Sequence, residues 1–337
     1  MAVIRGMMPA FELFQPASVD DALALLNRHG SDVWVLGGGL DSFDALYDRV
    51  RQPPVVVDLS GIQALRGIRE TAGALEIGAM TTLAEVVRDP AIRERFGLLG
   101  EGAELVGSPQ IRNQGTIGGN VSQDARCWYY RGGWTCYRAG GNMCYAEAPA
   151  AMNREHAIFD ANRCVAVNPS DTAPALVALD AKMVIRSSGT ERVVDAGDYF
   201  IGPAVDITRM TVLRPGDLLT AIRIPTTWAG ARFYFEKVRE RKAWDFALVN
   251  IASAMRISNG TIADIRLVVN AVAAHPLRLR AVEDAVRGKA ATEETATLAG
   301  DLAIQGVRPL RCNGYKVPLV RNLVRRAIRG GERPSTS

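Results

Sequence analysis

The sequence of 337 residues predicts an α+β protein with more than one structural unit, and three observations support this. A strand–loop–helix–strand pattern occupies residues 33–59. Three apolar segments from residue 231 onward are typical of antiparallel strands, and helical patterns follow them. A hydrophobic content of 48% is enough for a large core, so the length favours two domains or one domain with subdomains.

The N-terminal elements predict a small α/β unit over residues 1–64. SVDDALALLNRH has apolar residues at helical spacing, Ser18 and Asp21 suggest a capping box at its start, and Gly30 ends it. VWVL (33–36) predicts a buried strand, DSFDALYDRV a helix, and VVVDL (55–59) a second strand. This order is a small α/β unit.

The second predicted unit covers residues 65–226. Short strands such as ALEIGAM alternate with short helices, one of them capped by Thr82 and Glu85, and later come the helix DTAPALVAL and the strands AKMVIRSS and DLLTAIRIP. Residues 121–165 interrupt this unit with Arg, Gly, Tyr, Trp and Cys and no hydrophobic period. Such a long insertion is usually functional or disordered, and its aromatic residues argue against disorder.

The C-terminal elements predict an α+β domain over residues 231–332. TTWAGA is expected to be the linker that leads into it. ARFYFEKV, ALVNIASAMRI and TIADIRLVVNAV predict antiparallel strands. Helices are expected near 277–287, 291–304 and 315–329, with a tail at 333–337.

Net charge, hydropathy and the N-terminus exclude some functions. A net charge of +4 is weak support for nucleic-acid binding, so none is expected. No apolar run has the roughly 18 to 20 residues of a membrane span. MAVIRGMMPAFELF does not resemble a signal peptide, which predicts a cytoplasmic protein, or a periplasmic one exported with a signal-bearing partner. The basic cluster near the C-terminus is expected to be the solvated face of a helix: Arg321, Arg325, Arg326 and Arg329.

Two glycine-rich loops suggest an anion site. VLGGGLDS (35–42) follows a strand, and NQGTIGGN (113–120) adds the side chains of Thr116 and Asn120. Without Cβ atoms, backbone amides can approach a phosphate or pyrophosphate closely. Neither loop is a P-loop or a GxGxxG fingerprint, and the first alone is compatible with a structural turn. Together they favour two walls around a diphosphate.

Four of the five cysteines lie in the insertion: Cys127, Cys136, Cys144 and Cys164. Buried thiols, disulfides, zinc and an iron–sulfur cluster are the alternatives. A reducing cytoplasm counts against disulfides. The absence of a CxxC pair counts against zinc ribbons and ferredoxin-type motifs, although four thiolates still satisfy the ligand count of a [4Fe–4S] cluster.

Five segments in order resemble the FAD-binding subunit of the molybdenum hydroxylases: VLGGGLD, IGAMTTLAEV, SPQIRNQGTIGGNVSQ, NPSDTAPALVALDA and FEKVRERKAWDFALVNIA. That family includes xanthine dehydrogenase, aldehyde oxidoreductases, carbon monoxide dehydrogenase and 4-hydroxybenzoyl-CoA reductase. The resemblance implies a two-subdomain FAD-binding domain of the vanillyl-alcohol-oxidase (PCMH) type, followed by an α+β domain of the CO dehydrogenase flavoprotein type.

The resemblance also implies a set of FAD-binding residues. Asp171 matches a position near the nucleotide portion of the flavin, and Lys237 matches a lysine near the isoalloxazine end, where its charge would favour an anionic reduced flavin. The alternatives are an acid at a helix N-terminus and a lysine on a strand surface. The full set implied is Val35, Leu36, Gly37, Gly38, Gly39, Leu40, Asp41, Ser42, Val106, Gly107, Thr116, Gly119, Asn120, Ser122, Asp171, Leu219 and Lys237.

The first loop departs from the family pattern. AGGTDLL is usual there, whereas this chain has GGGLDSF, so Leu40 replaces a threonine and Ser42 a leucine. One side-chain hydrogen bond to the cofactor is therefore expected to be missing, while the backbone amides remain available.

For the cysteines, the resemblance is to the aldehyde oxidoreductase branch and 4-hydroxybenzoyl-CoA reductase. Cysteines placed as in RCWYYR, CYRAGG, MCYA and RCVAVNPSD ligate one [4Fe–4S] cluster there, which implies the same role for the four described above. The neighbouring Arg126, Arg131 and Arg138 would offset cluster charge or be ordinary surface residues. Cys312 is expected to be a buried structural thiol, and His156 to pack or hydrogen-bond rather than ligate.

The function implied is that of an electron-transfer flavin subunit without its own substrate site. The molybdopterin cofactor and two [2Fe–2S] clusters would lie on partner subunits, and electrons would leave to an external acceptor. REHAI before the fourth cysteine favours an aldehyde substrate. The alternatives are a ferredoxin-fed reductase of aromatic CoA thioesters, a purine or N-heterocycle dehydrogenase, a stand-alone flavin oxidase, and a zinc-stabilised binding module.

Overall fold

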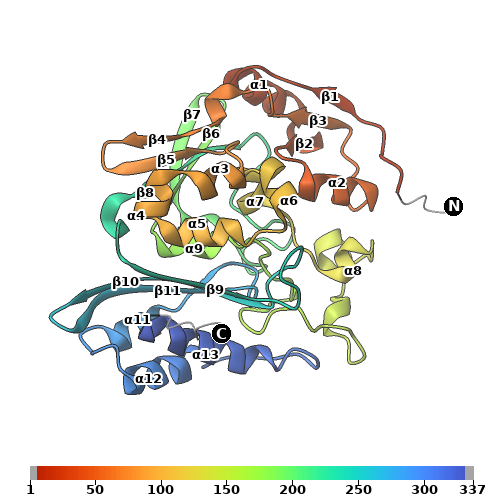
Figure 1. Cartoon of the computed structure of the whole chain (residues 1–337). Helices are drawn as coiled ribbons and strands as arrows, with labels where there is room; N and C mark the ends of the chain where they lie inside the picture. The colour runs from red at the N-terminus through yellow and green to blue at the C-terminus, as the bar shows by residue number, and fades with distance from the viewer. Residues whose placement is uncertain (1–5, 331–337) are drawn as a thin grey trace.

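The computed structural model describes residues 6–330, which fold into three successive sheets (Figure 1). The strand orders are β1-β3-β2, then β4-β5-β8-β6-β7, then β12-β11-β10-β9. The first sheet lies at the top of Figure 1 and the third lies below the second. The predicted tail at 333–337 and the last two residues of the predicted C-terminal domain lie outside the described residues.

The first sheet is parallel and belongs to the predicted α/β unit. Its elements are β1 (Glu12–Phe14), α1 (Val19–His29), β2 (Val33–Leu36), α2 (Leu40–Tyr47) and β3 (Val55–Asp58). The middle strand β3 is the most buried because it has a neighbour on each side. The Ser18 hydroxyl caps α1 as predicted, but the Asp21 carboxylate accepts from that hydroxyl, not from the Ser18 backbone.

The second sheet is antiparallel, and short helices surround it. Thr82 and Glu85 form the predicted capping box at the start of α3. The strands are β4 (Ile68–Thr71), β5 (Ala74–Gly78), β6 (Lys182–Ser187), β7 (Thr190–Asp195) and β8 (Leu218–Pro225). The helices are α3 (Leu83–Arg88), α4 (Pro90–Arg95), α5 (Gly97–Glu104), α6 (Pro109–Gln114), α7 (Ile117–Ser122), α9 (Ala173–Ala178) and α10 (Ala196–Tyr199).

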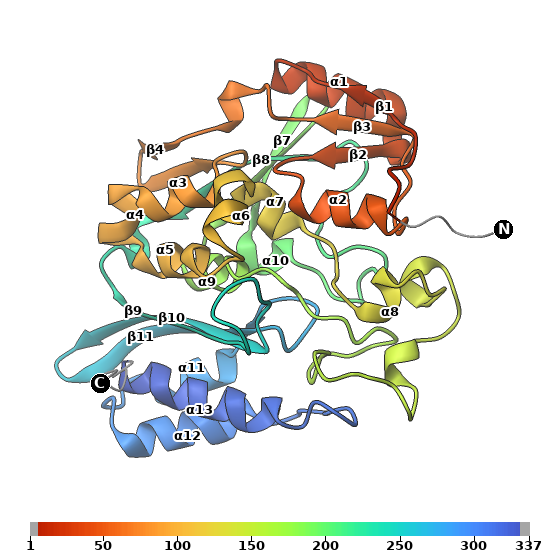
Figure 2. The same ribbon diagram turned by 45° about the vertical axis from the view of Figure 1, so that its right-hand side comes forward.

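The third sheet is also antiparallel and is buried on both faces. Because side chains alternate along a strand, Ile251 and Met255 of β10 pack with the C-terminal helices, whereas Ala252 and Ala254 join the core of the second unit (Figure 2). The elements are β9 (Arg232–Val238), β10 (Val249–Ser258), β11 (Thr261–Asn270), β12 (Leu277–Arg278), α11 (Arg280–Val286), α12 (Glu293–Ala303) and α13 (Lys316–Arg329). The shared core joins this unit firmly to the second.

Arg326 and Arg329 of α13 are exposed, as predicted, whereas Arg321 and Arg325 are half-buried against α12. Each pairs with a carboxylate on a neighbouring element; the pairs are Arg321–Asp301, Arg325–Glu293, Arg329–Glu293 and Arg326–Glu236. Within residues 6–330, no helix has the length and apolar character that crossing a membrane requires.

The segment TTWAGA connects β8 to β9, where the linker was predicted, and its Trp228 is 1% exposed in the core and donates a hydrogen bond to Asp180 at 2.7 Å. One prediction is wrong. Cys312 is exposed, not buried. The turn before α13 holds it at the surface, and its backbone N–H donates to Asn153 Oδ1 at 2.9 Å.

The cysteine loop, residues 121–165, is irregular apart from the end of α7, α8 (Trp128–Arg131) and two single turns of 3-10 helix. Both views place it beside α2 on one side and the C-terminal unit on the other.

Candidate cofactor site

The two glycine loops lie against each other, backbone to backbone. A Cβ added to Gly38 would fall 2.3 Å from the carbonyl oxygen of Gln114, and one added to Gly37 would fall 3.0 Å from Thr116 Oγ1. Gly39 has a φ of +82° where the first loop turns into α2. These positions require glycine because a side chain would separate the loops. The first loop runs into the N-terminus of α2, whose backbone N–H groups suit a phosphate or diphosphate.

Two cavities meet at these loops. The larger has a volume of about 620 Å³ and the smaller about 460 Å³. Both are lined by Gly37, Thr116 and Gly119, and so the glycine loops form their common wall. A ligand that fills both would be long, with an anionic middle at the glycines and a bulky group at each end, which is the shape of a dinucleotide.

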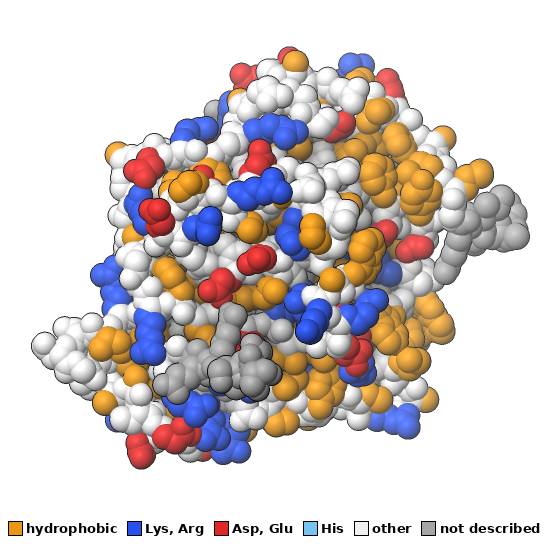
Figure 3. Space-filling view, in the orientation of Figure 1, with side chains coloured by type: hydrophobic (Ala, Val, Ile, Leu, Met, Phe, Trp, Pro, Cys, Tyr) orange, Lys and Arg blue, Asp and Glu red, His pale blue; other side chains and the backbone are white. Residues whose placement is uncertain are grey.

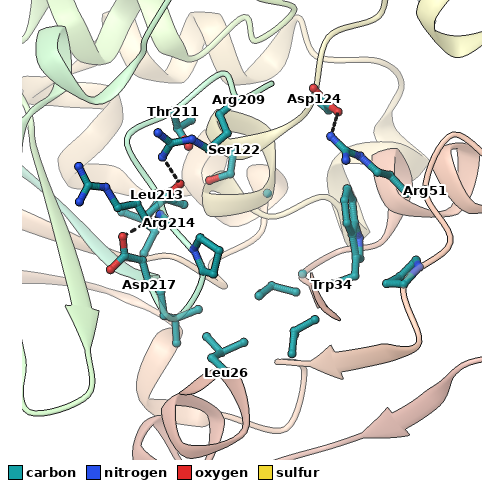
Figure 4. A pocket seen from close by; sticks show the side chains of 18 of the residues that line it. Leu26, Trp34, Arg51, Ser122, Asp124, Arg209, Thr211, Leu213, Arg214 and Asp217 are labelled. Atoms are coloured by element: carbon teal, nitrogen blue, oxygen red, sulfur yellow. Dashed lines mark hydrogen bonds and ion pairs between the residues drawn. The ribbon is translucent and has the colours of Figure 1, made fainter. Parts of the chain in front are cut away.

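Apolar and arginine side chains line the larger cavity, as Figure 4 shows. Arg209 is fixed by Asp206 Oδ2 at 2.8 Å and by the Leu213 carbonyl at 2.9 Å. Arg51 lies 3.3 Å from Asp124, and Leu26 and Trp34 lie among the apolar lining residues. This mixture suits a heterocyclic base joined to a phosphate.

Aromatic side chains line the smaller cavity. Phe43 comes from α2, and Trp244 and Phe246 come from the loop between β9 and β10. That loop is anchored where the Trp244 N–H donates to the Gly107 carbonyl at 2.9 Å, and the Arg126 guanidinium lies 5.1 Å from the Phe246 ring centre. A cavity with such walls suits a flat ring system.

A buried ion pair lies at the edge of the smaller cavity. Lys237 Nζ is 2.6 Å from Asp171 Oδ2, and their side chains are 0% and 5% exposed. Lys237 also donates to the carbonyls of Leu105 and Asp245, and Asn250 donates to Asp171 Oδ1. Burial raises the pKa of Asp171, although Lys237 and Asn250 oppose the shift.

Each of the two domains of the chain matches a known protein family. Residues 9–227 match the FAD binding domain in molybdopterin dehydrogenase, and residues 233–330 match the CO dehydrogenase flavoprotein C-terminal domain. The chain belongs to this family of FAD-binding medium subunits. It is therefore the flavin subunit of a molybdenum hydroxylase, an oxidoreductase, and the predicted two-part FAD domain followed by an α+β domain is confirmed.

Individual relatives agree with this assignment. The carbon monoxide dehydrogenase medium chain of Hydrogenophaga pseudoflava is 31% identical over 95% of this chain and 96% of its own length. The aldehyde oxidoreductase FAD-binding subunit of Escherichia coli is 28% identical over 85% and 87%. A solved chain of the Hydrogenophaga carbon monoxide dehydrogenase superposes with a TM-score of 0.77, covering 96% of this chain and 98% of that one.

Most FAD-binding residues predicted from the sequence line the cavities. Leu36 and Lys237 are absent from the lining of both. Leu219 lines the larger cavity. The smaller one is lined by Val35, Gly37, Gly38, Gly39, Leu40, Asp41, Ser42, Val106, Gly107, Thr116, Gly119, Asn120, Ser122 and Asp171.

Several of these side chains are already engaged within the flavin subunit. Asn120 Oδ1 accepts from the hydroxyls of Ser170 and Thr172, both at 2.6 Å. The hydroxyl of Ser42, one of the two departures from the family pattern, accepts from Trp34 Nε1 at 2.9 Å. These groups shape the cavity walls. The N–H groups at the start of α2, in the first loop, remain available as donors, because the second loop uses its own amides internally: Gly118 N–H donates to the Ala79 carbonyl and Gly119 N–H to Thr116 Oγ1.

The resemblance placed Asp171 and Lys237 at different parts of the flavin. Their contact at 2.6 Å joins them in one place, beside the smaller cavity. The alternative of a surface lysine is wrong, because the Lys237 side chain is fully buried. Trp244 and Phe246 were missed, although aromatic residues in the polar segment RKAWDF are a signal that could have indicated them.

The four cysteines of the insertion line one small cavity, with a volume of about 10 Å³. All five cysteines of the chain are free thiols, so no disulfide joins them. Burial raises the pKa of Cys127 to about 11 and also raises the pKa values of Cys144 and Cys164. Among residues 6–330, no three His, Cys, Asp or Glu side chains are gathered tightly enough to hold a metal ion.

Buried ion pairs connect the cysteine loop to the first glycine loop. Arg131 donates to Asp41 Oδ1 at 2.8 Å, and Asp41 Oδ2 accepts from the Asp124 N–H at 3.0 Å. Arg138, which lines the cysteine cavity, pairs with Asp124. Burial would raise the pKa of Asp124, but Arg138 and Arg51 outweigh it and the pKa is lowered. Arg131 and Arg138 are therefore buried partners of carboxylates and not surface residues.

Proposed function

We propose that FAD lies across both cavities. The adenosine half occupies the larger cavity, the diphosphate contacts the glycine loops, and the isoalloxazine ring occupies the smaller cavity. Arginine and apolar side chains in the larger cavity support the first assignment. The aromatic walls of the smaller cavity, with Asp171 in its lining, support the last. When bound, the flavin supplies two-electron and one-electron redox chemistry, while these residues bind it and exclude water.

The second part of the proposal is a [4Fe–4S] cluster bound by Cys127, Cys136, Cys144 and Cys164. It is supported by the observation that all four cysteines line one cavity. A zinc ion would need its thiolates at about 2.3 Å from a single point. Among the described residues, no group of three ligand-type side chains is placed to hold a metal ion, yet all four thiols border the same cavity. Four thiolates match the ligand count of a four-iron cluster.

The cluster would contribute one-electron chemistry beside the flavin. The thiols that would bind the cluster are partly or fully buried. Arg138 lies in the wall of the same cavity, where its ion pair with Asp124 holds it. Since Asp124 and Asp41 also hold the first glycine loop, the same network positions both cofactor sites.

We further propose that the flavin subunit works inside a complex. A molybdopterin-containing large subunit and a [2Fe–2S] small subunit would pass electrons to FAD, and an external acceptor would remove them. The face beside the cofactor cavities is apolar along the right-hand edge of Figure 3, where Figure 1 places α2 and α8. Phe43 and Tyr47 of α2 and Trp128 of α8 are 37%, 43% and 43% exposed there. Such surfaces commonly mark protein interfaces.

The proposed substrate is an aldehyde, oxidised at the molybdenum site of the partner. The aldehyde oxidoreductase subunit among the relatives supports this choice, together with the cysteine loop. Flavin bleaching by an aldehyde in the whole complex, and none in the flavin subunit alone, is the expected result. Bleaching of the isolated subunit would instead select a stand-alone oxidase. Activity only with a reduced ferredoxin and an aromatic CoA thioester would select the reductase.

The cluster is tested by an anaerobic visible spectrum of the purified subunit with iron, zinc and flavin quantified. We expect FAD and about four irons per chain. Cys136→Ser should lose iron and keep FAD. Cys312→Ser is the matched control, because Cys312 is exposed and absent from the lining of the cysteine cavity, and it should keep both. Zinc in place of iron, or iron retained in Cys136→Ser, would contradict the proposal.

A further inference from the structure

A buried histidine contacts one of the four cysteines. His156 Nε2 lies 3.2 Å from Cys127 Sγ, within the range of a hydrogen bond to sulfur. The His156 side chain belongs to a residue that is 3% exposed. The other ring nitrogen, Nδ1, is buried and has no hydrogen-bond partner among residues 6–330. Within the described part of the chain, Cys127 is therefore the polar contact that orients this imidazole.

The backbone around His156 is held in place by the C-terminal unit. Asn313 Nδ2 donates to the carbonyls of His156 and Ala157 at 3.0 and 3.1 Å. Lys316, at the start of α13, donates to the carbonyls of Glu155 and Ala271 at 3.0 and 2.7 Å. Because these contacts fix the segment before any cofactor binds, the ring faces Cys127 without further ordering.

The chemistry of the two groups sets the direction of the hydrogen bond. A thiolate that ligates iron has no proton, so it can only accept. The imidazole must then carry its proton on Nε2, because the partner of one ring nitrogen decides the tautomer and Nδ1 has none. An N–H directed at a ligand sulfur stabilises the more negative, reduced state of a cluster and raises its potential.

We infer that His156 is a positioning residue for the cluster, which donates Nε2–H to the Cys127 thiolate and sets the reduction potential of the [4Fe–4S] site. This inference rests on the cluster proposed above. His156 would then influence the reduction potential of the cluster without ligating iron. The inference also predicts that the cluster is redox-active.

Two variants separate this role from simple packing. His156→Gln keeps an amide N–H that can reach the same sulfur, whereas His156→Leu keeps apolar volume and removes the donor. The matched control is His275→Leu, because His275 is the partner of Asp160 and does not line the cysteine cavity. Each variant is purified anaerobically as the full chain, its iron is quantified, and the midpoint potential of the cluster is measured by an electron paramagnetic resonance titration.

We expect the midpoint of His156→Leu to be more negative than that of the wild type, with His156→Gln and His275→Leu close to the wild type. If His156→Leu loses iron, recovery of iron and of the wild-type midpoint by His156→Gln still supports the inference. A wild-type midpoint in His156→Leu, or an equal shift in the Gln variant, would overturn it. A wild-type chain without iron would overturn the cluster proposal itself, and the iron assay shows this before any potential is measured.

Discussion

Replacing Gly38 with alanine tests the contact between the two glycine loops. The new Cβ would lie 2.3 Å from Gln114 O and 2.9 Å from Gly115 Cα. Ordinary van der Waals contact begins at 3.4 Å, so the methyl group falls about 1 Å too close. The atoms that it meets belong to the backbone and cannot rotate away. The loops must therefore separate, and the proposed diphosphate site is distorted with them.

The expected cost follows from the size of this overlap. Forcing an extra methyl group into a packed site costs about 1–3 kcal/mol. If the cost falls on the bound geometry, FAD binding weakens about 5- to 150-fold. Gly197→Ala is the matched control, since its Cβ would meet no atom within 4 Å and its residue lies in α10. Alanine there is expected to leave FAD affinity unchanged and to favour the helix slightly.

The assay is a titration of the apo subunit with FAD, followed by quenching of flavin fluorescence, with thermal unfolding of the same apo samples. Gly38→Ala should bind FAD more weakly than both the wild type and Gly197→Ala. Equal affinity in all three would refute the reasoning, because it would mean that the loops need not touch to hold the cofactor.

Two further predictions concern buried charge. Lys237→Met leaves the Asp171 carboxylate without its cation and should destabilise the chain by about 3–5 kcal/mol in urea unfolding, and adding Asp171→Asn should restore part of it. Because burial raises the pKa of Asp171, the loss of stability in Lys237→Met should become smaller on acidification, when the carboxyl is protonated. A double variant that is no more stable than Lys237→Met would contradict the role of the buried pair. Asp124→Asn removes the partner of Arg138. The lowered folded-state pKa of Asp124 means that its contribution is present above the ordinary value of 3.8 and lost as pH falls through the folded value. Calorimetry should therefore show that the difference in unfolding temperature between the wild type and Asp124→Asn becomes smaller in acid. A difference that does not change with pH would argue against the ion pair.

Local signals made much of the first two units predictable. Ser18 and Thr82 cap the helices that follow them, because a cap depends only on residues within one turn. The glycine loops were identified as anion sites for the same reason, since a missing Cβ is visible in the sequence. The third sheet followed from three apolar segments in a row, and its strands pair as predicted.

Long-range contacts were not predictable in the same way. Nothing near Lys237 in the sequence indicates that its partner is Asp171, which lies 66 residues earlier. Arg131 and Asp41 are 90 residues apart, yet they form one ion pair between the two loops. Trp228 was assigned to a linker because its neighbours are polar and small, and only the packed core shows that it is buried. Such pairings depend on how the sheets stack, which local propensity does not determine.

The sequence by itself determined the two glycine loops and the four clustered cysteines, because residue spacing is a property of the chain. Only the tertiary structure decided how they are arranged. It brought the glycine loops into contact, placed two cavities on either side of them, and gathered the four cysteines around one cavity beside His156. The physical reason is that each of these sites is built from segments that meet only after the three sheets pack together.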